Sequence, residues 1–60
     1  MNELRKNYEM MLEVMNEANM DLAKFEAGNS SAGTRVRKAM QNVKDLAQQI
    51  RLAVQEIKNS

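Results

Sequence analysis

Four residue types are missing from this 60-residue chain: cysteine, histidine, proline and tryptophan. Without cysteine there is no disulfide framework and no thiolate metal site, and without histidine the usual zinc ligand and the usual neutral-pH base are absent. Only carboxylates, amines and hydroxyls remain for chemistry. The composition therefore predicts no catalytic residue, no metal site, no cofactor and no small-molecule substrate, and it argues against an enzyme.

Breaks in the chain are equally scarce. The only two glycines, Gly28 and Gly33, lie close together, so neither glycine nor proline interrupts the chain before or after them. No apolar run approaches the ~20 residues that cross a bilayer, and the first residues lack the apolar core of a signal peptide. We therefore expect two long segments joined by one turn, in a cytoplasmic protein without membrane contact.

Apolar residues recur in both segments at alternating spacings of four and three, which keeps them in one stripe on an α-helix. This pattern predicts helices over about residues 3–27 and 30–58 with a turn at 28–30. The expected fold is an all-α, two-helix antiparallel hairpin that forms a single domain over residues 1–60. The stripe residues, which we expect to form the core, are Leu4, Tyr8, Met11, Met15, Ala18, Leu22, Phe25, Val36, Met40, Val43, Ala47, Ile50, Val54 and Ile57.

A hairpin of this size buries too little apolar surface to be comfortably stable alone. Each stripe is also too wide for a single neighbouring helix to cover. We therefore expect a homodimer in which two hairpins pack as an antiparallel four-helix bundle. The six methionines suit such a core because the thioether side chain fills irregular gaps.

The turn has its own residue requirements. Gly28 suits the left-handed position just past the end of a helix. Asn29, Ser30 or Ser31 can cap the following helix, with Thr34 as the competing cap if the turn is longer. The small side chains at positions 32 and 33, Ala32 and Gly33, would let the two helices approach closely beside Phe25.

Charge is divided unevenly between the halves although the net charge is only +1. Residues 1–27 carry three cations and six carboxylates, a net charge of −3, whereas residues 28–60 carry six cations and two carboxylates, a net charge of +4. Cations recur every seven residues along the second segment, and glutamines lie beside them. We call the four cations the basic row: Arg37, Lys44, Arg51 and Lys58. Together with the neighbouring glutamines Gln41, Gln48 and Gln55, the row suits contacts with the phosphates of a nucleic acid.

The row also has a purely structural explanation. Charges at the edge of an apolar stripe often pair with a neighbouring helix. The first segment offers partners at four-residue spacing, namely Glu9, Glu13, Glu17 and Asp21. If Lys44, Arg51 and Lys58 pair with these carboxylates, their role is structural and they do not bind phosphate.

The start of the second segment is harder to explain by stability. No acidic residue lies between Glu26 and Asp45, although the first turn of a helix has free N–H groups and favours negative charge. Cations and hydrogen-bond donors concentrated there are suited to an anion such as phosphate. The predicted phosphate-binding residues are Arg35, Arg37, Lys38, Lys44, Arg51, Asn29, Ser30, Ser31 and Thr34.

The segment from residue 28 to residue 39 resembles bacterial histone-like proteins of the chlamydial linker-histone type. The matching pattern, Gly-Asn, then Ala, then Arg-any-Arg, falls on Gly28, Asn29, Ala32, Arg35 and Arg37. Similarity extends to residues 21–24, 44–47 and 50–51. The resemblance implies a small, mostly helical protein of the bacterial nucleoid that binds DNA with little sequence preference and self-associates through its helices.

Two alternatives to DNA remain open from the sequence. Structured RNA presents the same phosphate chemistry to a basic helix. A protein-interaction module, in which the basic helix pairs with an acidic helix, is the other alternative. DNA is the favoured partner because of the histone-like resemblance.

Overall fold

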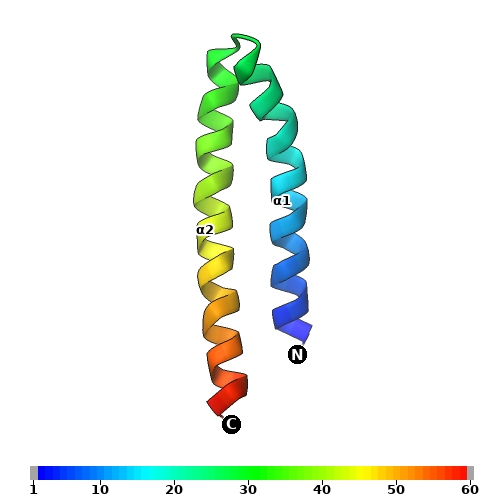
Figure 1. Ribbon diagram of the computed structural model, residues 1–60, viewed down its shortest axis with the longest axis vertical. Coiled ribbons are helices and arrows are strands. Elements are labelled where there is room, and N and C mark those ends of the chain that lie inside the picture. Colours follow the sequence, from blue (N-terminus) through cyan, green and yellow to red (C-terminus); the bar gives the residue numbers. More distant parts are fainter. Residues whose placement is uncertain (1, 60) are drawn as a thin grey trace.

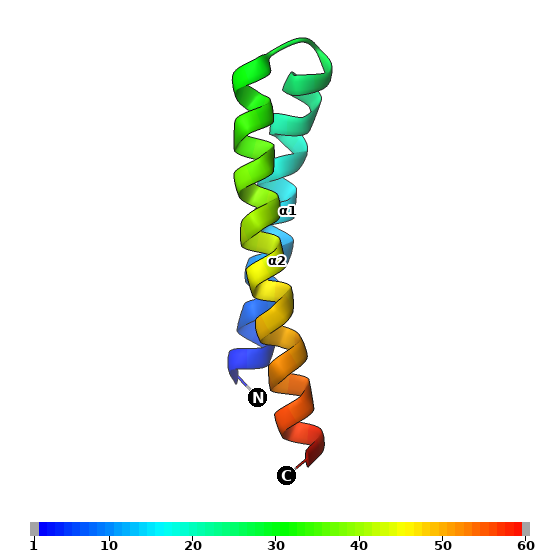
Figure 2. The ribbon, with the colours of Figure 1, turned by 90° about the vertical axis from the view of Figure 1, so that its left-hand side faces the viewer.

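The computed structural model describes residues 2–59, which form two helices. Helix α1 spans Asn2–Glu26 and helix α2 spans Ser30–Asn59. They run antiparallel along nearly their whole length, in a molecule that measures 49 × 14 × 11 Å (Figure 1). The longer α2 extends past the first residues of α1, so the C-terminal end projects beyond the N-terminal end (Figure 2). The predicted all-α hairpin is confirmed.

Glycine at the turn ends α1 in the left-handed conformation. Gly28 has φ +105°, and its N–H donates to the carbonyl of Phe25 (3.0 Å) while the N–H of Asn29 donates to the carbonyl of Lys24 (3.0 Å). This pair of bonds satisfies carbonyls that a helix end leaves free, and it reverses the chain within three residues. Gly28 therefore occupies the position that the sequence predicts.

Asn29 caps the start of α2. Its Oδ1 accepts hydrogen bonds from the N–H of Ala32 (3.3 Å) and from the Oγ of Ser31 (2.8 Å). An Asn side chain that accepts from the third residue of the helix is a strong N-cap. Of the possible caps, the structure thus uses Asn29, and α2 begins at Ser30.

Small residues bring the two helices into contact just after the turn. Ala32 is fully buried, and a Cβ added to Gly33 would lie 2.7 Å from two ring carbons of Phe25. The ring therefore lies on the bare backbone of Gly33. The predicted close approach of the two helices beside Phe25 is confirmed.

The contact between α1 and α2 uses only one edge of each apolar stripe. The buried residues among those described are Ala18, Ala32 and Leu46, and half-buried residues such as Val14 and Val43 lie between them. Asn7 of α1 donates to Gln49 of α2 across this contact at 3.4 Å. Each stripe spans about three residues in seven, so a single neighbouring helix covers one edge of the stripe and leaves the other edge in solvent.

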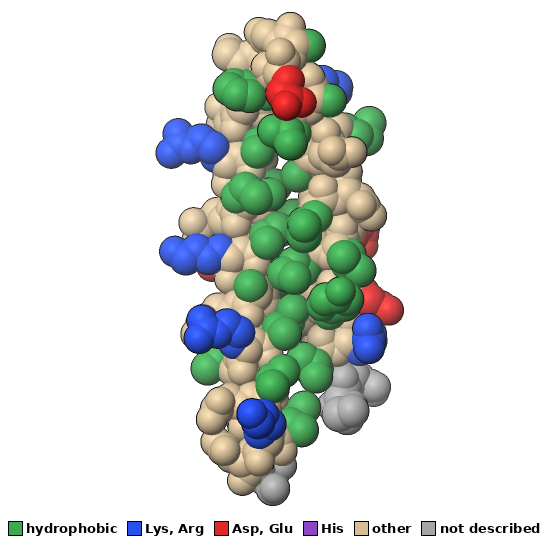
Figure 3. All heavy atoms as spheres, in the orientation of Figure 1, with side chains coloured by type: hydrophobic (Ala, Val, Ile, Leu, Met, Phe, Trp, Pro, Cys, Tyr) green, Lys and Arg blue, Asp and Glu red, His purple; other side chains and the backbone are tan. Residues whose placement is uncertain are grey.

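Half of the expected core residues are consequently exposed in the hairpin. Seven of the fourteen stripe residues keep between 40% and 50% of their surface in solvent. We call these the apolar face: Tyr8, Met15, Leu22, Phe25, Met40, Val54 and Ile57. The space-filling view shows hydrophobic side chains along the groove between the two helices (Figure 3).

Candidate nucleic-acid interface

The basic row lies along the outer edge of α2, next to the apolar face. Lys and Arg side chains follow this edge over most of the helix (Figure 3). The reason is helical spacing, because Arg37 precedes Met40 by three residues and Arg51 precedes Val54 by three, which makes them neighbours on the helix surface. Arg37, Lys44, Arg51 and Lys58 are all exposed.

These cations have no carboxylate partner within the part of the chain that the structure describes. Between residues 2 and 59 the one ion pair joins Arg35 and Asp21. The acidic residues Glu9, Glu13 and Glu17 do not pair with Lys44, Arg51 or Lys58 there. Within one hairpin, no carboxylate of α1 in the described residues pairs with the basic row, so its charges are available to another molecule.

Arg35 differs from the other cations of the helix start. Its Nε donates to Oδ1 of Asp21 at 2.8 Å, with 47% of the Arg35 side chain and 23% of the Asp21 side chain exposed. The bond joins α2 to α1 near the turn, so this guanidinium has a structural role. Of the predicted group Arg35, Arg37 and Lys38, the structure thus places Arg35 against Asp21, whereas Arg37 lines a hollow at the turn end.

The turn end of the apolar face has a hollow of about 370 Å³. Arg37 lines it together with the predicted donors Ser30 and Thr34, and its apolar wall includes Phe25 and Gly33. Here the structure brings together three of the predicted phosphate-binding residues. Asn29 and Ser31 are instead occupied with each other in the cap.

A second hollow, of about 360 Å³, lies on α2 between Lys44 and Arg51. Gln48 and Ala47 line it, as does the carboxylate-bearing Asp45. Asp45 accepts a hydrogen bond from Nε2 of Gln41 at 3.3 Å. One carboxylate, that of Asp45, therefore lies beside the basic row. The seven-residue spacing of the cations, considered alone, did not indicate this neighbour.

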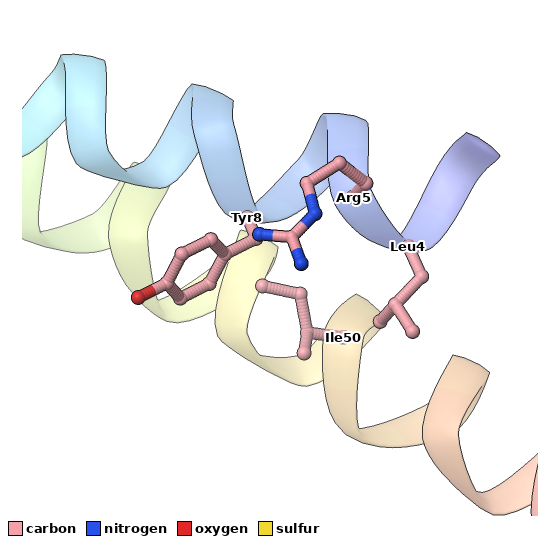
Figure 4. Close-up of a pocket in the computed structure, with 4 residues that line it drawn as sticks. All are labelled: Leu4, Arg5, Tyr8 and Ile50. Atoms are coloured by element: carbon pink, nitrogen blue, oxygen red, sulfur yellow. The ribbon is translucent and has the colours of Figure 1, made fainter. Parts of the chain in front are cut away.

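A third hollow, of about 410 Å³, opens at the other end of the hairpin. Leu4, Arg5 and Tyr8 of α1 and Ile50 of α2 line it, and the guanidinium of Arg5 lies beside the ring of Tyr8 (Figure 4). The Cζ of Arg5 is 5.7 Å from the ring centroid, within the range of a cation–π contact. Sequence reasoning assigned Tyr8 to the core and missed this contact, although the three-residue spacing from Arg5 is a signal for it.

Residues 2–59 contain no group of three or more Asp or Glu side chains placed to hold a metal ion. Neither helix, over the same residues, has a stretch long and apolar enough to cross a membrane.

The geometry defines an elongated helical module with a cationic flank and an exposed apolar face, a class of protein suited to contact with other macromolecules. Over residues 5–60 the chain matches the family model described as histone H1-like protein Hc1, and it belongs to this family. The histone-like resemblance carried by Gly28, Asn29 and Arg37 is therefore confirmed. A comparison with curated proteins found no match, and a comparison with solved structures found none.

Proposed function

We propose that the chain binds the sugar–phosphate backbone of DNA, with little sequence preference, as a homodimer of the bacterial nucleoid. Membership of a histone H1-like family supports DNA as the partner. The observation that carries the proposal is the exposed basic row Arg37, Lys44, Arg51 and Lys58, whose charges no carboxylate of residues 2–59 neutralises by pairing.

Phosphate contacts explain affinity without sequence readout. Lys and Arg side chains that neutralise phosphates release counterions, and such contacts carry no base information. Aromatic stacking on bases is not part of the proposal, because Tyr8 and Phe25 are both on the apolar face, with Tyr8 beneath Arg5 and Phe25 against Gly33.

The predicted phosphate-binding residues take different roles in this proposal. Arg37, Lys44 and Arg51 contact phosphates directly, with Ser30 and Thr34 as hydrogen-bond donors beside Arg37. Lys38 is exposed and unpaired and adds to the positive field. Arg35, Asn29 and Ser31 act indirectly, since their contacts hold the turn and the start of α2 in place.

The homodimer is proposed because the hairpin leaves its apolar face in solvent. Monomeric soluble proteins rarely expose a contiguous apolar patch larger than a few hundred Å². Seven large side chains, each at least 40% exposed along two adjacent helices, exceed what scattered surface residues produce. A second hairpin against this face completes the four-helix bundle.

Binding of labelled duplex DNA at several salt concentrations tests the phosphate surface. The test variant carries Arg37→Gln, Lys44→Gln and Arg51→Gln, and the control carries Arg5→Gln, Lys6→Gln and Lys24→Gln on α1. Both lose three positive charges, so the two variants have the same net charge.

We expect the α2 variant to bind weakly at every salt concentration, and its plot of log K against log salt to be shallower by about 2.7, which is ~0.9 for each lost phosphate contact. The α1 control should keep most of the slope. Equal losses in both variants would contradict a surface on α2. Preferential displacement of the duplex by hairpin RNA would reassign the partner to RNA.

A further inference from the structure

The four cations of the basic row belong to a longer repeat along α2. Each cation follows, by three residues, an uncharged side chain that forms hydrogen bonds. Residues three apart are neighbours on the surface of a helix, so each pair forms one compact group. We call this series of pairs the outer strip: Thr34 with Arg37, Gln41 with Lys44, Gln48 with Arg51, and Gln55 with Lys58.

The outer strip lies on the side of α2 that faces away from α1. Leu46, which is 6% exposed in the contact with α1, has Lys44 two positions before it and Gln48 two positions after it. Two residues correspond to a rotation of about 200° around a helix, which is nearly the opposite side. The half-buried Ala39 and Ala53 have strip residues at the same two positions. All the strip residues are exposed, and no carboxylate in the described part of α1 forms an ion pair with them.

A partner on the apolar face leaves the outer strip uncovered. Arg37 and Arg51 each lie three residues before a residue of that face, Met40 and Val54, so the cations form the edge of the strip nearest to the face. The uncharged members of the pairs form the opposite edge, farther from the face. Access to the strip is therefore the same in a single hairpin and in a homodimer, whichever way a second copy is oriented.

The uncharged side chains of the strip are available to a ligand. Gln48 lines a hollow together with two cations of the basic row. Neither Gln48 nor Gln55 forms a hydrogen bond with any described residue, whereas Nε2 of Gln41 donates to Asp45 at 3.3 Å. A glutamine amide has two N–H donors and no charge. A phosphate that reaches a cation of the strip therefore meets a neutral donor beside it, where a carboxylate would repel it.

The repeat of the outer strip matches the dimensions of duplex DNA. Seven residues of helix rise by about 10.5 Å, whereas a base pair occupies ~3.4 Å of the duplex axis, so one group falls about every three base pairs. From Thr34 to Lys58 the strip measures about 36 Å at ~1.5 Å per residue. One turn of duplex DNA is ~34–36 Å long, or about 10 base pairs. The strip is thus as long as one full turn.

We propose that the outer strip binds one full turn of duplex DNA, with the duplex axis along α2, and that the uncharged residue of each pair binds phosphate beside its cation. The backbone of each strand crosses the facing side of a duplex once per turn. A duplex shorter than one turn therefore leaves part of the strip without phosphates. This inference rests on the proposed function and adds to it the length of the ligand and the glutamines as binding residues.

Alanine variants test the glutamines. The test variant carries Gln48→Ala and Gln55→Ala, and the matched control carries Asn16→Ala and Asn42→Ala, which remove exposed amides outside the strip. The test variant should bind duplex DNA about fivefold more weakly at every salt concentration, because each lost hydrogen bond contributes a few-fold. Its plot of log K against log salt should keep the native slope, because no charge is removed. Native affinity in the test variant, or equal losses in both variants, would overturn the role of the glutamines.

Single substitutions at the two ends of the strip test its length. Arg37→Gln and Lys58→Gln are each measured with duplexes of about 16 and about 6 base pairs, closed by the same short loop so that both stay paired. On the long duplex each variant should bind several-fold more weakly, with a salt slope shallower by ~0.9. The short duplex covers about half of the strip and can move to the remaining groups, so each loss should be less than about twofold. Equal losses on both duplexes would overturn a strip one turn long.

The two proposals fail in different ways. If the native chain shows no salt-dependent binding of the long duplex, the proposed function itself is contradicted. If the native chain binds in a salt-dependent way but is insensitive to the glutamines or to duplex length, only the outer strip is contradicted.

Discussion

Replacing Leu46 with alanine should destabilise the hairpin far more than the same replacement at Leu52. Both leucines are on α2, but Leu46 is 6% exposed in the contact with α1 whereas Leu52 is 57% exposed. The two substitutions remove the same atoms from the same helix. Their difference therefore measures the contact between the helices and not the helical propensity of the residues.

The magnitude follows from burial. Alanine lacks about three of leucine's buried carbon groups, and at ~0.8 kcal/mol for each the loss at Leu46 is about 2.4 kcal/mol. Less than half of the surface of Leu52 is out of water, so Leu52→Ala should lower the free energy of unfolding by about 1 kcal/mol or less. Because 60 residues give a total stability of roughly 3–9 kcal/mol, the first change removes a large share of it.

Thermal and urea unfolding, followed by circular dichroism at one fixed chain concentration, provides the assay. The midpoint for Leu46→Ala should lie about 10 °C below that of Leu52→Ala, since 1 kcal/mol shifts the melting temperature of a small domain by ~4–8 °C. A fixed concentration matters because self-association contributes to apparent stability. Equal midpoints for the two variants would refute the position assigned to the contact between α1 and α2.

Substitutions at three further positions have distinct expected outcomes. Gly28→Ala should lower the free energy of unfolding by about 1–2 kcal/mol because φ +105° is strained for any residue with a Cβ, and an unchanged urea midpoint would contradict this. Asn29→Ala should cost about 1 kcal/mol through loss of the cap, while Asn29→Asp should retain stability, a contrast that the same unfolding curves measure. Asp45→Asn should tighten duplex binding several-fold at low salt because a carboxylate leaves the hollow between Lys44 and Arg51, and weaker binding would count against that hollow as a phosphate contact.

The elements of this fold are predictable because local chemistry determines them. The spacing of the apolar residues predicts both helices, and Gly28 marks the turn regardless of the rest of the chain. The contact between Gly33 and Phe25 is also foreseeable, since only small residues permit it next to a tight turn. In each case the physical cause lies within a few residues of the feature.

The register and rotation of the two helices are not determined locally. A stripe that is three residues wide has two edges, and the choice that buries Leu46 and exposes Met40 depends on how both helices pack together. The ion pair of Arg35 with Asp21 has the same origin, because fourteen residues of chain separate the two groups and only the turn brings them together.

The basic row is intermediate between these cases. Its heptad spacing was visible in the sequence, but whether a carboxylate of α1 pairs with it depends on the rotation of the helices. Because α1 packs on the other edge of the α2 stripe, Lys44 and Arg51 remain unpaired within residues 2–59. Asp45 lies beside them because it follows Lys44 directly in the sequence and is exposed on the same helix.

The most direct test of the central claim is a map of amide chemical shifts on adding duplex DNA to the isotope-labelled chain. The proposal predicts that the largest changes occur at and beside Arg37, Lys44, Gln48 and Arg51 of α2, and that they diminish as salt is raised. Changes concentrated instead on the outer surface of α1, or unaffected by salt, would contradict a phosphate-binding flank on α2.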